Sequence, residues 1–260
     1  MSRPEVTIPN HKEVNTFYGL YRPKKAAAWA INIALGIGLA PRVSFDEGVE
    51  NRIEQLFEEK RNIMMSSKHH RRIDPFVLAA GAIRNRALRP FVAHSFIFSK
   101  APNSEKPLQR YVLDILGQMP AFRKEDVDPE FHELIPAANF GLIKAARKRK
   151  DDGLLPVLFG EGGTIEDTHQ VAELQKGVGM IACYKPTPED KQSAILPIGL
   201  YYVPYETGNS IEKLHSLRHP YMHVGTALEG PFTNADDVLV QLRPAMQSAQ
   251  DTAIKLAEAA

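Results

Sequence analysis

Cysteine is almost absent from this 260-residue chain, in which Cys183 is the only one. A single thiol excludes an internal disulfide and a metal centre built from several thiolates, and it fits a reducing compartment. A charge imbalance is also lacking, because 32 Lys and Arg residues stand against 31 Asp and Glu residues, giving a formal net charge of +1. The chain therefore has no global field of the kind that marks a dedicated nucleic-acid-binding protein, and we expect no nucleic-acid partner.

Long apolar runs are missing as well. The first apolar stretch, Ala26–Ala40, would form a helix of about 15 residues and about 22 Å, short of the roughly 30 Å hydrocarbon core of a bilayer. Basic residues flank it and Trp29 lies near one end, which favours a helix lying in a membrane surface; a buried core helix is the alternative. We assign residues 1–42 to an N-terminal membrane-interfacial helical segment and residues 43–260 to one domain.

The opening stretch Met1–Glu13 does not resemble an export signal, because it is polar and contains two prolines. Together with the single cysteine, this predicts a cytoplasmic protein that is peripheral on the inner face of the membrane.

Predicted strands and helices alternate along most of the chain. This alternation predicts an α/β fold with a mostly parallel central sheet flanked by helices. The expected strands are Asn62–Ser67, Phe91–Phe98, Gly117–Arg123, Leu154–Phe159, Ala194–Val203 and Tyr221–Ala227, with a short strand and turn in Val43–Ile53. The expected helices are Pro75–Ile83, Leu108–Leu116, Glu133–Lys150, Lys176–Cys183 and Asp236–Ala259, and Glu54–Lys60 is expected to be a charged surface segment.

A histidine and a carboxylate lie in the turn between the first predicted buried strand and the helix that follows it. His69 precedes Asp74 by five positions, so the carboxylate can fold back onto the imidazole. A histidine held by a carboxylate can act as a general base toward a hydroxyl group. The spacing alone does not establish a site, because a chain with 9 histidines can contain one such pair by chance.

Two further strand ends carry groups suited to an anionic ligand. Arg123 ends one short strand, and Leu154–Phe159 runs into a glycine-rich turn at Gly160–Thr164. Such a turn brings backbone amides close to a ligand and can bind an anion, although a plain tight turn is the alternative. Ligands of α/β folds favour strand ends, so we expect these groups to gather near His69.

Four sequence blocks now stand in a fixed order: K-H-H-R-R-I-D, G-Q-M-P-A-F-R, F-G-E-G-G-T and I-L-P-I-G. In order and spacing they resemble the four motifs of the glycerolipid acyltransferase superfamily, the 1-acylglycerol-3-phosphate O-acyltransferases. Those motifs are N-H-x-S-x-x-D, G-x-I-P-I-D-R, F-P-E-G-T-R-S and a proline-centred apolar strand. The resemblance covers roughly residues 69–199.

The resemblance implies a role for each matching residue. His69 would be the general base and Asp74 its orienting carboxylate, while Arg123 would bind the phosphate of the acceptor. Pro197 would belong to the acyl-donor side. The acceptor-positioning turn would comprise Glu161, Gly162 and Gly163. The implied reaction is direct transfer of a fatty acyl group from acyl-CoA or acyl carrier protein to a lysophospholipid hydroxyl. It would need no resident cofactor, no metal and no acyl-enzyme, so Cys183 need not be catalytic.

The sequence departs from the family pattern at several positions. Lys68 replaces an asparagine, Arg71 a serine and Gly160 a proline, while Thr164 stands where a second phosphate-binding arginine is expected. Planar bidentate recognition of phosphate is an arginine property. Arg71, Arg72 or Lys176 can substitute, or the acceptor is a different lysolipid, a glycolipid or another hydroxylated amphiphile.

Three rival interpretations remain open at this point. A metal site would draw on His69, His70, Asp74 and His94, although H-x-x-x-x-D is not a zinc spacing. A lipid-binding scaffold that has kept the fold and lost activity is the second alternative. A hydrolase in which water replaces the alcohol is the third. The presence of both His69 and Asp74 favours an enzyme.

Overall fold

The computed structural model describes residues 3–22, 25–71, 73–100, 111, 114–162, 169–183, 193–203 and 219–260. The described strands form one sheet in the order β1-β7-β6-β2-β5-β3-β4, with β8 paired to β6. Strands β6, β2, β5, β3 and β4 run parallel to one another, while β7 and β8 are antiparallel to β6 and β1 is parallel to β7. The predicted α/β fold with a mostly parallel sheet is therefore confirmed. The strands are β1 Arg42–Phe45, β2 Asn62–Ser67, β3 Ser95–Lys100, β4 Gln118–Ala121, β5 Leu155–Phe159, β6 Ser193–Tyr201, β7 Tyr221–Val224 and β8 Leu228–Glu229.

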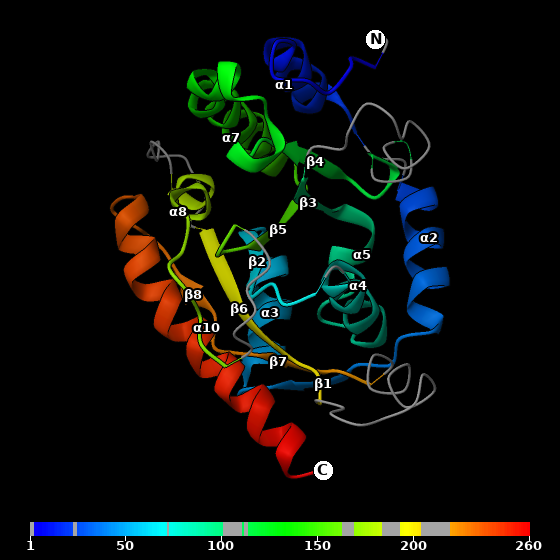
Figure 1. Ribbon diagram of the computed structural model, residues 1–260. Helices are drawn as coiled ribbons and strands as arrows, with labels where there is room; N and C mark the ends of the chain where they lie inside the picture. Colours follow the sequence, from blue (N-terminus) through cyan, green and yellow to red (C-terminus); the bar gives the residue numbers. More distant parts are fainter. Residues whose placement is uncertain are drawn as a thin grey trace.

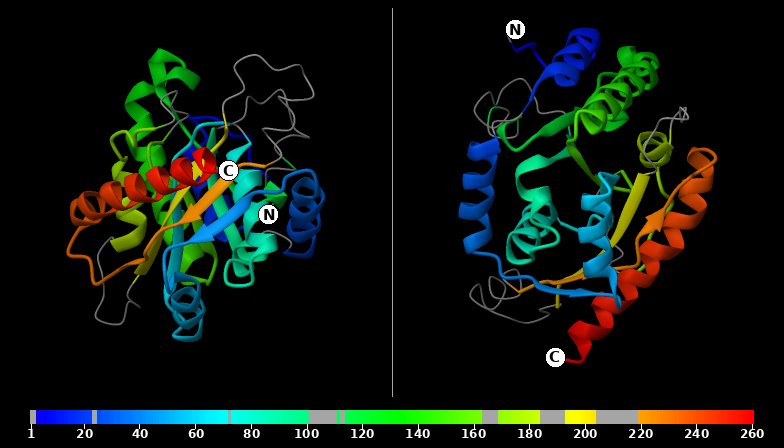
Figure 2. Two further views of the ribbon diagram at one scale, coloured as in Figure 1. Left: turned by 90° about the horizontal axis from the view of Figure 1, so that it is seen from below. Right: turned by 180° about the vertical axis from the view of Figure 1, so that it is seen from behind.

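Helices cover both faces of the sheet (Figures 1 and 2). Helices α7, α8 and α10 lie on one face, and α3, α4 and α5 lie on the other. Helix α1 packs against α7, and α2 packs against α4 and α5. The two termini lie at opposite ends of the molecule. The helices are α1 His11–Leu20, α2 Lys25–Ile37, α3 Val49–Glu58, α4 Asp74–Arg84, α5 Pro90–His94, α7 Ile135–Asp151, α8 Lys176–Cys183 and α10 Ala235–Glu258, with short 3-10 helices at η1 Lys124–Asp126 and η2 Pro129–Leu134.

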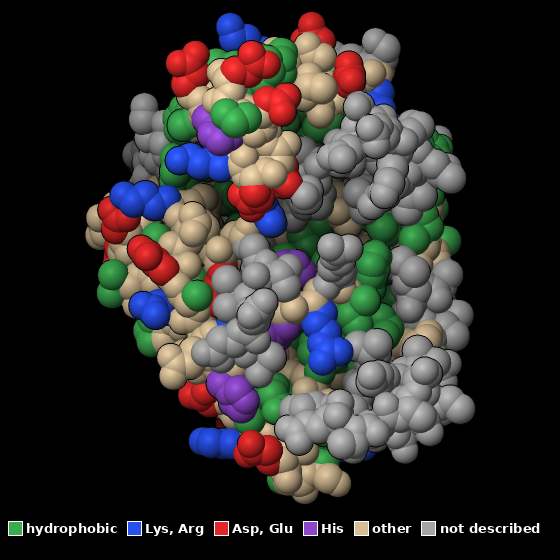
Figure 3. Space-filling view, viewed as in Figure 1, with side chains coloured by type: hydrophobic (Ala, Val, Ile, Leu, Met, Phe, Trp, Pro, Cys, Tyr) green, Lys and Arg blue, Asp and Glu red, His purple; other side chains and the backbone are tan. Residues whose placement is uncertain are grey.

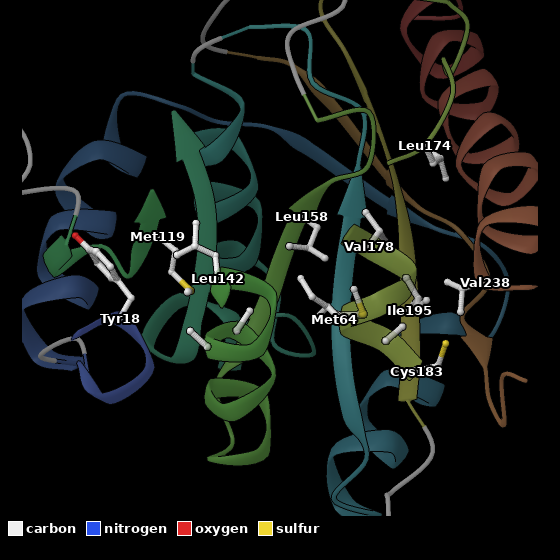
Figure 4. Close-up of a cluster of buried hydrophobic side chains, with 14 of the residues drawn as sticks. Tyr18, Met64, Met119, Leu142, Leu158, Leu174, Val178, Cys183, Ile195 and Val238 are labelled. Carbon is white, nitrogen blue, oxygen red and sulfur yellow. The ribbon is translucent and has the colours of Figure 1, made fainter. Parts of the chain in front are cut away.

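The alternation of side chains along each strand produces these two layers. In β2, Met64 enters the core beneath α7, α8 and α10, whereas Ile63 and Met65 enter the core beneath α3, α4 and α5. Figure 4 shows the first of these cores, in which Cys183 lies among apolar side chains. Its thiol contacts the carbonyl of Gly179, and burial raises its pKa. The only cysteine is thus part of the core.

Most predicted elements agree with the structure to within a few residues. Strand β2 and helix α8 have the predicted bounds, and α7 ends at Asp151, just before the predicted glycine stop. Gly153 has a φ of 83° and ends that helix in a left-handed conformation, which glycine adopts without steric cost.

Two predictions were wrong. The segment predicted as strand, turn and charged surface contains helix α3, whose buried residues Val49, Ile53 and Leu56 form one helical face. The predicted strand Phe91–Phe98 is instead the end of α5 followed by β3, because Pro90 begins a helical turn there. The predicted helix Leu108–Leu116 lies largely outside the described residues.

The segment assigned to residues 1–42 contains two helices of different character. Helix α1, which the sequence did not predict, contributes Val14, Phe17 and Tyr18 to the core beside α7. Helix α2 corresponds to the predicted interfacial helix and carries Trp29, whose surface is 49% exposed. Within the described ranges, no helix is long and apolar enough to cross a membrane.

The fourth sequence block lies in β6 and has a structural explanation. Gly199 allows α10 to approach the strand, because a Cβ at this position would clash with the carbonyl oxygen of Ala249. Pro197 lies between the part of β6 that pairs with β8 and the part that pairs with β7, so its missing N–H removes no bond from the ladder. Its carbonyl accepts a hydrogen bond from the N–H of Gly225 at 2.9 Å.

Candidate functional site

Three adjacent parallel strands bring the central candidate residues to one edge of the sheet. Strands β6, β2 and β5 are neighbours, and they end at Tyr201, Ser67 and Phe159 respectively. The residues just beyond these ends therefore lie side by side, as expected for the carboxyl ends of parallel strands. In the space-filling view, histidine side chains appear in the middle of the face, beside basic and apolar surface (Figure 3).

The predicted pair of His69 and Asp74 is formed. His69 Nδ1 lies 2.9 Å from Asp74 Oδ2, and the Asp74 side chain is completely buried. Asp74 begins helix α4 and is followed by Pro75, so its carboxylate occupies the positive end of the helix dipole and faces back onto the preceding turn. The strand–turn–helix order that the sequence predicted is what brings the two side chains together.

The Asp74 carboxylate is held by three donors besides His69. Its Oδ2 accepts the backbone N–H groups of His70 and Arg71 at 2.6 and 2.8 Å, and its Oδ1 accepts the hydroxyl of Tyr202 at 2.6 Å. A carboxylate surrounded by donors acts only as an acceptor, so the proton between the pair belongs to His69 Nδ1. The other ring nitrogen, Nε2, then carries the lone pair that a general base needs.

His69 combines a fixed ring with a reachable nitrogen. Its imidazole stacks on the ring of Phe159 with a centroid distance of 4.2 Å and an interplanar angle of 23°. Its side chain is 15% exposed, and Nε2 forms no hydrogen bond within the described part of the chain. Asp74 and Phe159 thus set the orientation of the ring while Nε2 stays open to a substrate.

Glu161 is close to His69 but turned into the protein. Its Oε2 accepts the backbone N–H of His69 at 3.3 Å, and its Oε1 accepts the N–H of Ala172 at 2.7 Å. The Lys68 ammonium lies 3.4 Å from Oε1 and also donates to the carbonyl of Gln170. Both side chains of this ion pair are 0% exposed. The carboxylate therefore fixes the backbone of the His69 turn and has no atom facing the solvent from which an acceptor would approach.

The ion pair also gives a structural role to Lys68, a position at which the sequence differs from the motif that it resembles. Lys68 stands where the family has asparagine, and its charge neutralises the buried Glu161 of the third block. The first and third blocks are therefore joined directly through these two side chains.

The side chain of His70 takes no part in the pair, although its backbone N–H binds Asp74. Its Nε2 lies 2.9 Å from the carbonyl oxygen of Leu200, and its Nδ1 is buried without a hydrogen-bond partner among the described residues. Burial, only partly offset by the Asp74 charge, lowers its pKa. His70 is therefore neutral at pH 7 and serves the packing between β6 and α10.

The predicted anion-binding residues are spread more widely than the sequence indicated. Arg71 lies in the His69 turn, and its guanidinium carbon is 4.7 Å from the ring centroid of Tyr202. Arg123 follows β4, three strand spacings from β2, which corresponds to about 14 Å along the sheet. Lys176, at the start of α8, lies 3.3 Å from Asp236 of α10, and within the described residues it has no contact with the His69 turn.

The remaining predicted positions are placed as follows. Gly162 is exposed in the turn after β5 and has a φ of 75°, a conformation that favours glycine. Pro197 is buried in the middle of β6, opposite Ser66 of β2. Gly163, Thr164 and Arg72 lie outside the described residues.

Sequence reasoning missed Phe159, which stacks on His69, and Tyr202, which donates to Asp74. Tyr202 lies 128 positions from Asp74, so no local spacing connects them. The sequence contains one signal for Tyr202. It directly follows the end of a buried strand, and His69 lies two residues after the end of another. Identifying it required knowing that β6 and β2 are neighbours.

No cluster of three or more His, Cys, Asp or Glu side chains that could hold a metal ion is found where the chain is described, and the side chain of His94 lies outside that part. No protein-family model and no curated protein matches the chain. The likeness to the glycerolipid acyltransferases is thus a resemblance carried by the four sequence blocks.

Proposed function

We propose that the protein is an O-acyltransferase that moves a fatty acyl group from acyl-CoA or acyl carrier protein to the hydroxyl of a lysophospholipid. The observation that carries this proposal is the geometry of His69, which has one ring nitrogen on a buried carboxylate and the other open. The same pair also suits a hydrolase, but the order of the four blocks favours an alcohol as the nucleophile.

The chemistry follows from the orientation of the pair. The acceptor hydroxyl attacks the thioester carbonyl while its proton passes to His69 Nε2, and Asp74 stabilises the imidazolium that forms. The thiolate of the carrier leaves and takes up that proton. One general base serves both halves of the reaction, and no side chain needs to be acylated.

An apolar pocket lies on the same face of the sheet as His69. It runs beneath α4 from Pro75 and Phe76, next to Asp74, to Ile97 of β3 and Gln118 of β4. Met65 of β2 and Val157 of β5 also line it. Each lies two residues, about 7 Å, before the end of its strand, and the His69–Asp74 pair follows the end of β2. Its apolar lining suits a hydrocarbon, but its volume of about 40 Å³ admits only a few methylene groups, so it would take one part of a fatty acyl chain and not the whole chain.

Anionic head groups would be met by Arg71, which lies within the His69 turn and forms no ion pair within the described residues. Arg123 would reach a more distant part of the ligand. Because Lys176 is paired with Asp236, it is a weaker candidate than the sequence indicated. A non-phosphatidate acceptor such as a glycolipid remains the alternative on the acceptor side.

We further propose that α2 docks the protein on the inner face of a membrane. Trp29 is the only tryptophan in the chain, and it is half exposed on α2. Its fluorescence therefore reports on this helix alone. Adding anionic vesicles should shift the emission to shorter wavelength if Trp29 enters the interface. An unchanged spectrum on vesicles that do bind the protein would contradict the docking of α2.

A panel assay tests the activity. Purified protein is incubated with labelled acyl-CoA or acyl carrier protein and with lysophosphatidate, other lysophospholipids, a glycolipid and monoacylglycerol in turn. The proposal predicts labelled ester on at least one acceptor with an anionic head group. Transfer only to the glycolipid would select the alternative acceptor. Release of free fatty acid in every reaction would favour a hydrolase, and no turnover with any acceptor would favour a lipid-binding scaffold.

A further inference from the structure

Tyr202 makes two contacts at the site, from two different parts of its side chain. Its hydroxyl donates to Asp74 Oδ1 at 2.6 Å, and its ring face lies 4.7 Å from the guanidinium carbon of Arg71. The side chain is buried, and burial together with the Asp74 charge raises the pKa of Tyr202 well above its usual value, so the hydroxyl keeps its proton. It is therefore a hydrogen-bond donor at neutral pH.

Asp74 depends on this donor because its two oxygens are held differently. Oδ2 is shared among His69 and two backbone N–H groups, whereas Tyr202 is the only described hydrogen-bond donor to Oδ1. Without the hydroxyl, a buried carboxylate oxygen would lose its partner, and the carboxylate could rotate about its bond to Cβ. The hydroxyl therefore sets the angle of the carboxylate behind His69.

Arg71 depends on the ring. Its backbone N–H is bound to Asp74 and its guanidinium lies over Tyr202, so the cation is held beside the pair. A guanidinium stacked on an aromatic ring keeps its N–H edges free for an anion, and the cation–π contact favours this placement.

We infer that Tyr202 is a positioning residue that couples the two halves of the site: its hydroxyl orients the Asp74 carboxylate behind His69, and its ring holds Arg71 where a phosphate-bearing ligand would bind. This inference rests on the proposed function for the meaning of the two halves. The contacts themselves can be tested without any turnover.

The first test follows the Nδ1–H proton of His69 by NMR, using the His69→Gln variant to assign its resonance. Tyr202→Phe removes the donor and leaves the ring. The Asp74 carboxylate is then held less firmly, so the hydrogen bond from His69 Nδ1 should weaken and its proton resonance should move to higher field and broaden. Tyr201→Phe is the matched control, because Tyr201 is the neighbouring residue and packs against α10. The same resonance position and width in wild type and Tyr202→Phe would overturn the role of the hydroxyl.

The second test measures binding of lysophosphatidate by calorimetry below its aggregation concentration. Arg71→Ala and Tyr202→Leu should each raise the Kd about tenfold, whereas Tyr202→Phe, which keeps the ring, should stay within about twofold of wild type. We expect inorganic phosphate to compete with lysophosphatidate for the site. Such competition would show that the head group alone is recognised. Equal affinity in Tyr202→Leu and Tyr202→Phe would overturn the role of the ring, as would a wild-type protein that does not bind lysophosphatidate.

Turnover separates this inference from the proposed function. In an active protein, Tyr202→Phe should lower kcat about tenfold with little change in the KM of the acceptor, because the base is misoriented while the anion site is kept. Absence of all activity in the wild type would end the acyltransferase proposal, whereas the NMR and binding results would still decide the role of Tyr202.

Discussion

Among single residues, Lys68 and Glu161 show how an unusual side chain can become part of the framework of a site. Their ion pair is fully buried, and the carboxylate also accepts two backbone N–H groups, one of them from His69. The pair therefore connects the turn after β2 to the segment that follows β5. Charged groups in such a position are costly to leave unpaired.

Replacing only Lys68 should destabilise the fold. In Lys68→Met, Glu161 would stay buried without its cation, and the free energy of unfolding should fall by about 3 kcal/mol. The double variant Lys68→Met with Glu161→Gln should recover part of this loss, because the buried charge is gone. Urea unfolding of both variants measures the difference. If the double variant loses as much free energy of unfolding as the two single variants together, the two side chains are not coupled.

His70 predicts how stability depends on pH. Its pKa is lowered in the folded protein by burial, whereas the unfolded chain has a pKa of about 6.5. Between these values the unfolded chain binds more protons, so the free energy of unfolding should be constant above about pH 6.5 and should fall as the pH falls below it. His70→Gln should show a smaller loss between pH 7 and pH 5 in thermal unfolding. An identical loss in both proteins would assign the pH dependence to other groups.

The residues of the site differed in how well the sequence could predict them. His69 and Asp74 are five positions apart across one turn, so local structure alone brings them together. Tyr202 and Lys68 act through contacts between distant segments, which depend on strand order. The structure also changed the expectation for Glu161, whose burial could not be read from a glycine-rich turn.

At the level of helices, α3 and α7 end in the same way but with different residues. Each ends with two backbone hydrogen bonds to its last turn. In α3, the N–H of Lys60 donates to the carbonyl of Phe57 and the N–H of Arg61 donates to the carbonyl of Leu56. In α7, Gly153 and the residue after it form the matching pair. The residue between helix and loop has a positive φ in both, 55° at Lys60 and 83° at Gly153. A side chain in this conformation is strained, whereas glycine is not.

Substituting these two residues should change the free energy of unfolding in opposite directions. Lys60→Gly should raise the free energy of unfolding by about 1 kcal/mol, because it removes the left-handed strain. Gly153→Ala should lower it by a similar amount. Chemical denaturation of the two variants checks the sign of each change. A loss of stability in Lys60→Gly would show that the lysine side chain stabilises the helix end by more than its backbone strain costs.

The sequence identified the elements whose pattern is strong and missed those whose pattern is mixed. Strands β5 and β6 are almost continuous apolar runs, and β2 contains the apolar run Ile63–Met65; each lies between clear turn signals. Helix α3 is highly charged and has only a narrow buried face, but its apolar residues at positions 49, 53 and 56 carry the helical period. Helix α5 is only five residues long, too short for a periodic signal, so its apolar residues have the same pattern as the adjoining strand.

In the whole molecule, the sheet places an apolar pocket on the same face as the proposed base. Ala79 of α4 lines this pocket with Leu78 and Phe91. The pocket has a volume of about 40 Å³, so if part of the acyl chain enters it, Ala79→Val should fill it and shift the preferred donor to a shorter chain, with the rate for short donors kept. Competition between acyl-CoA donors of different length measures the shift. An unchanged preference would place the acyl chain elsewhere.

The N-terminal helix belongs to the body of the protein. Arg149 of α7 is buried and donates to the carbonyl of Tyr18, which ties α1 to α7. Burial and the charge of Arg22 lower the pKa of Arg149 to about 10, which leaves it charged at neutral pH. Removing α1 together with α2 would expose this core, so membrane binding is better tested by the fluorescence of Trp29 than by truncation.

The central claim is that His69 is the base of an acyl transfer, and the initial rate of ester formation tests it most directly. Wild type, His69→Ala and Cys183→Ala are compared on one acceptor at equal folded fraction. The account predicts that His69→Ala loses about 100-fold to 10,000-fold in rate and that Cys183→Ala keeps the wild-type rate. Equal rates for wild type and His69→Ala would contradict it.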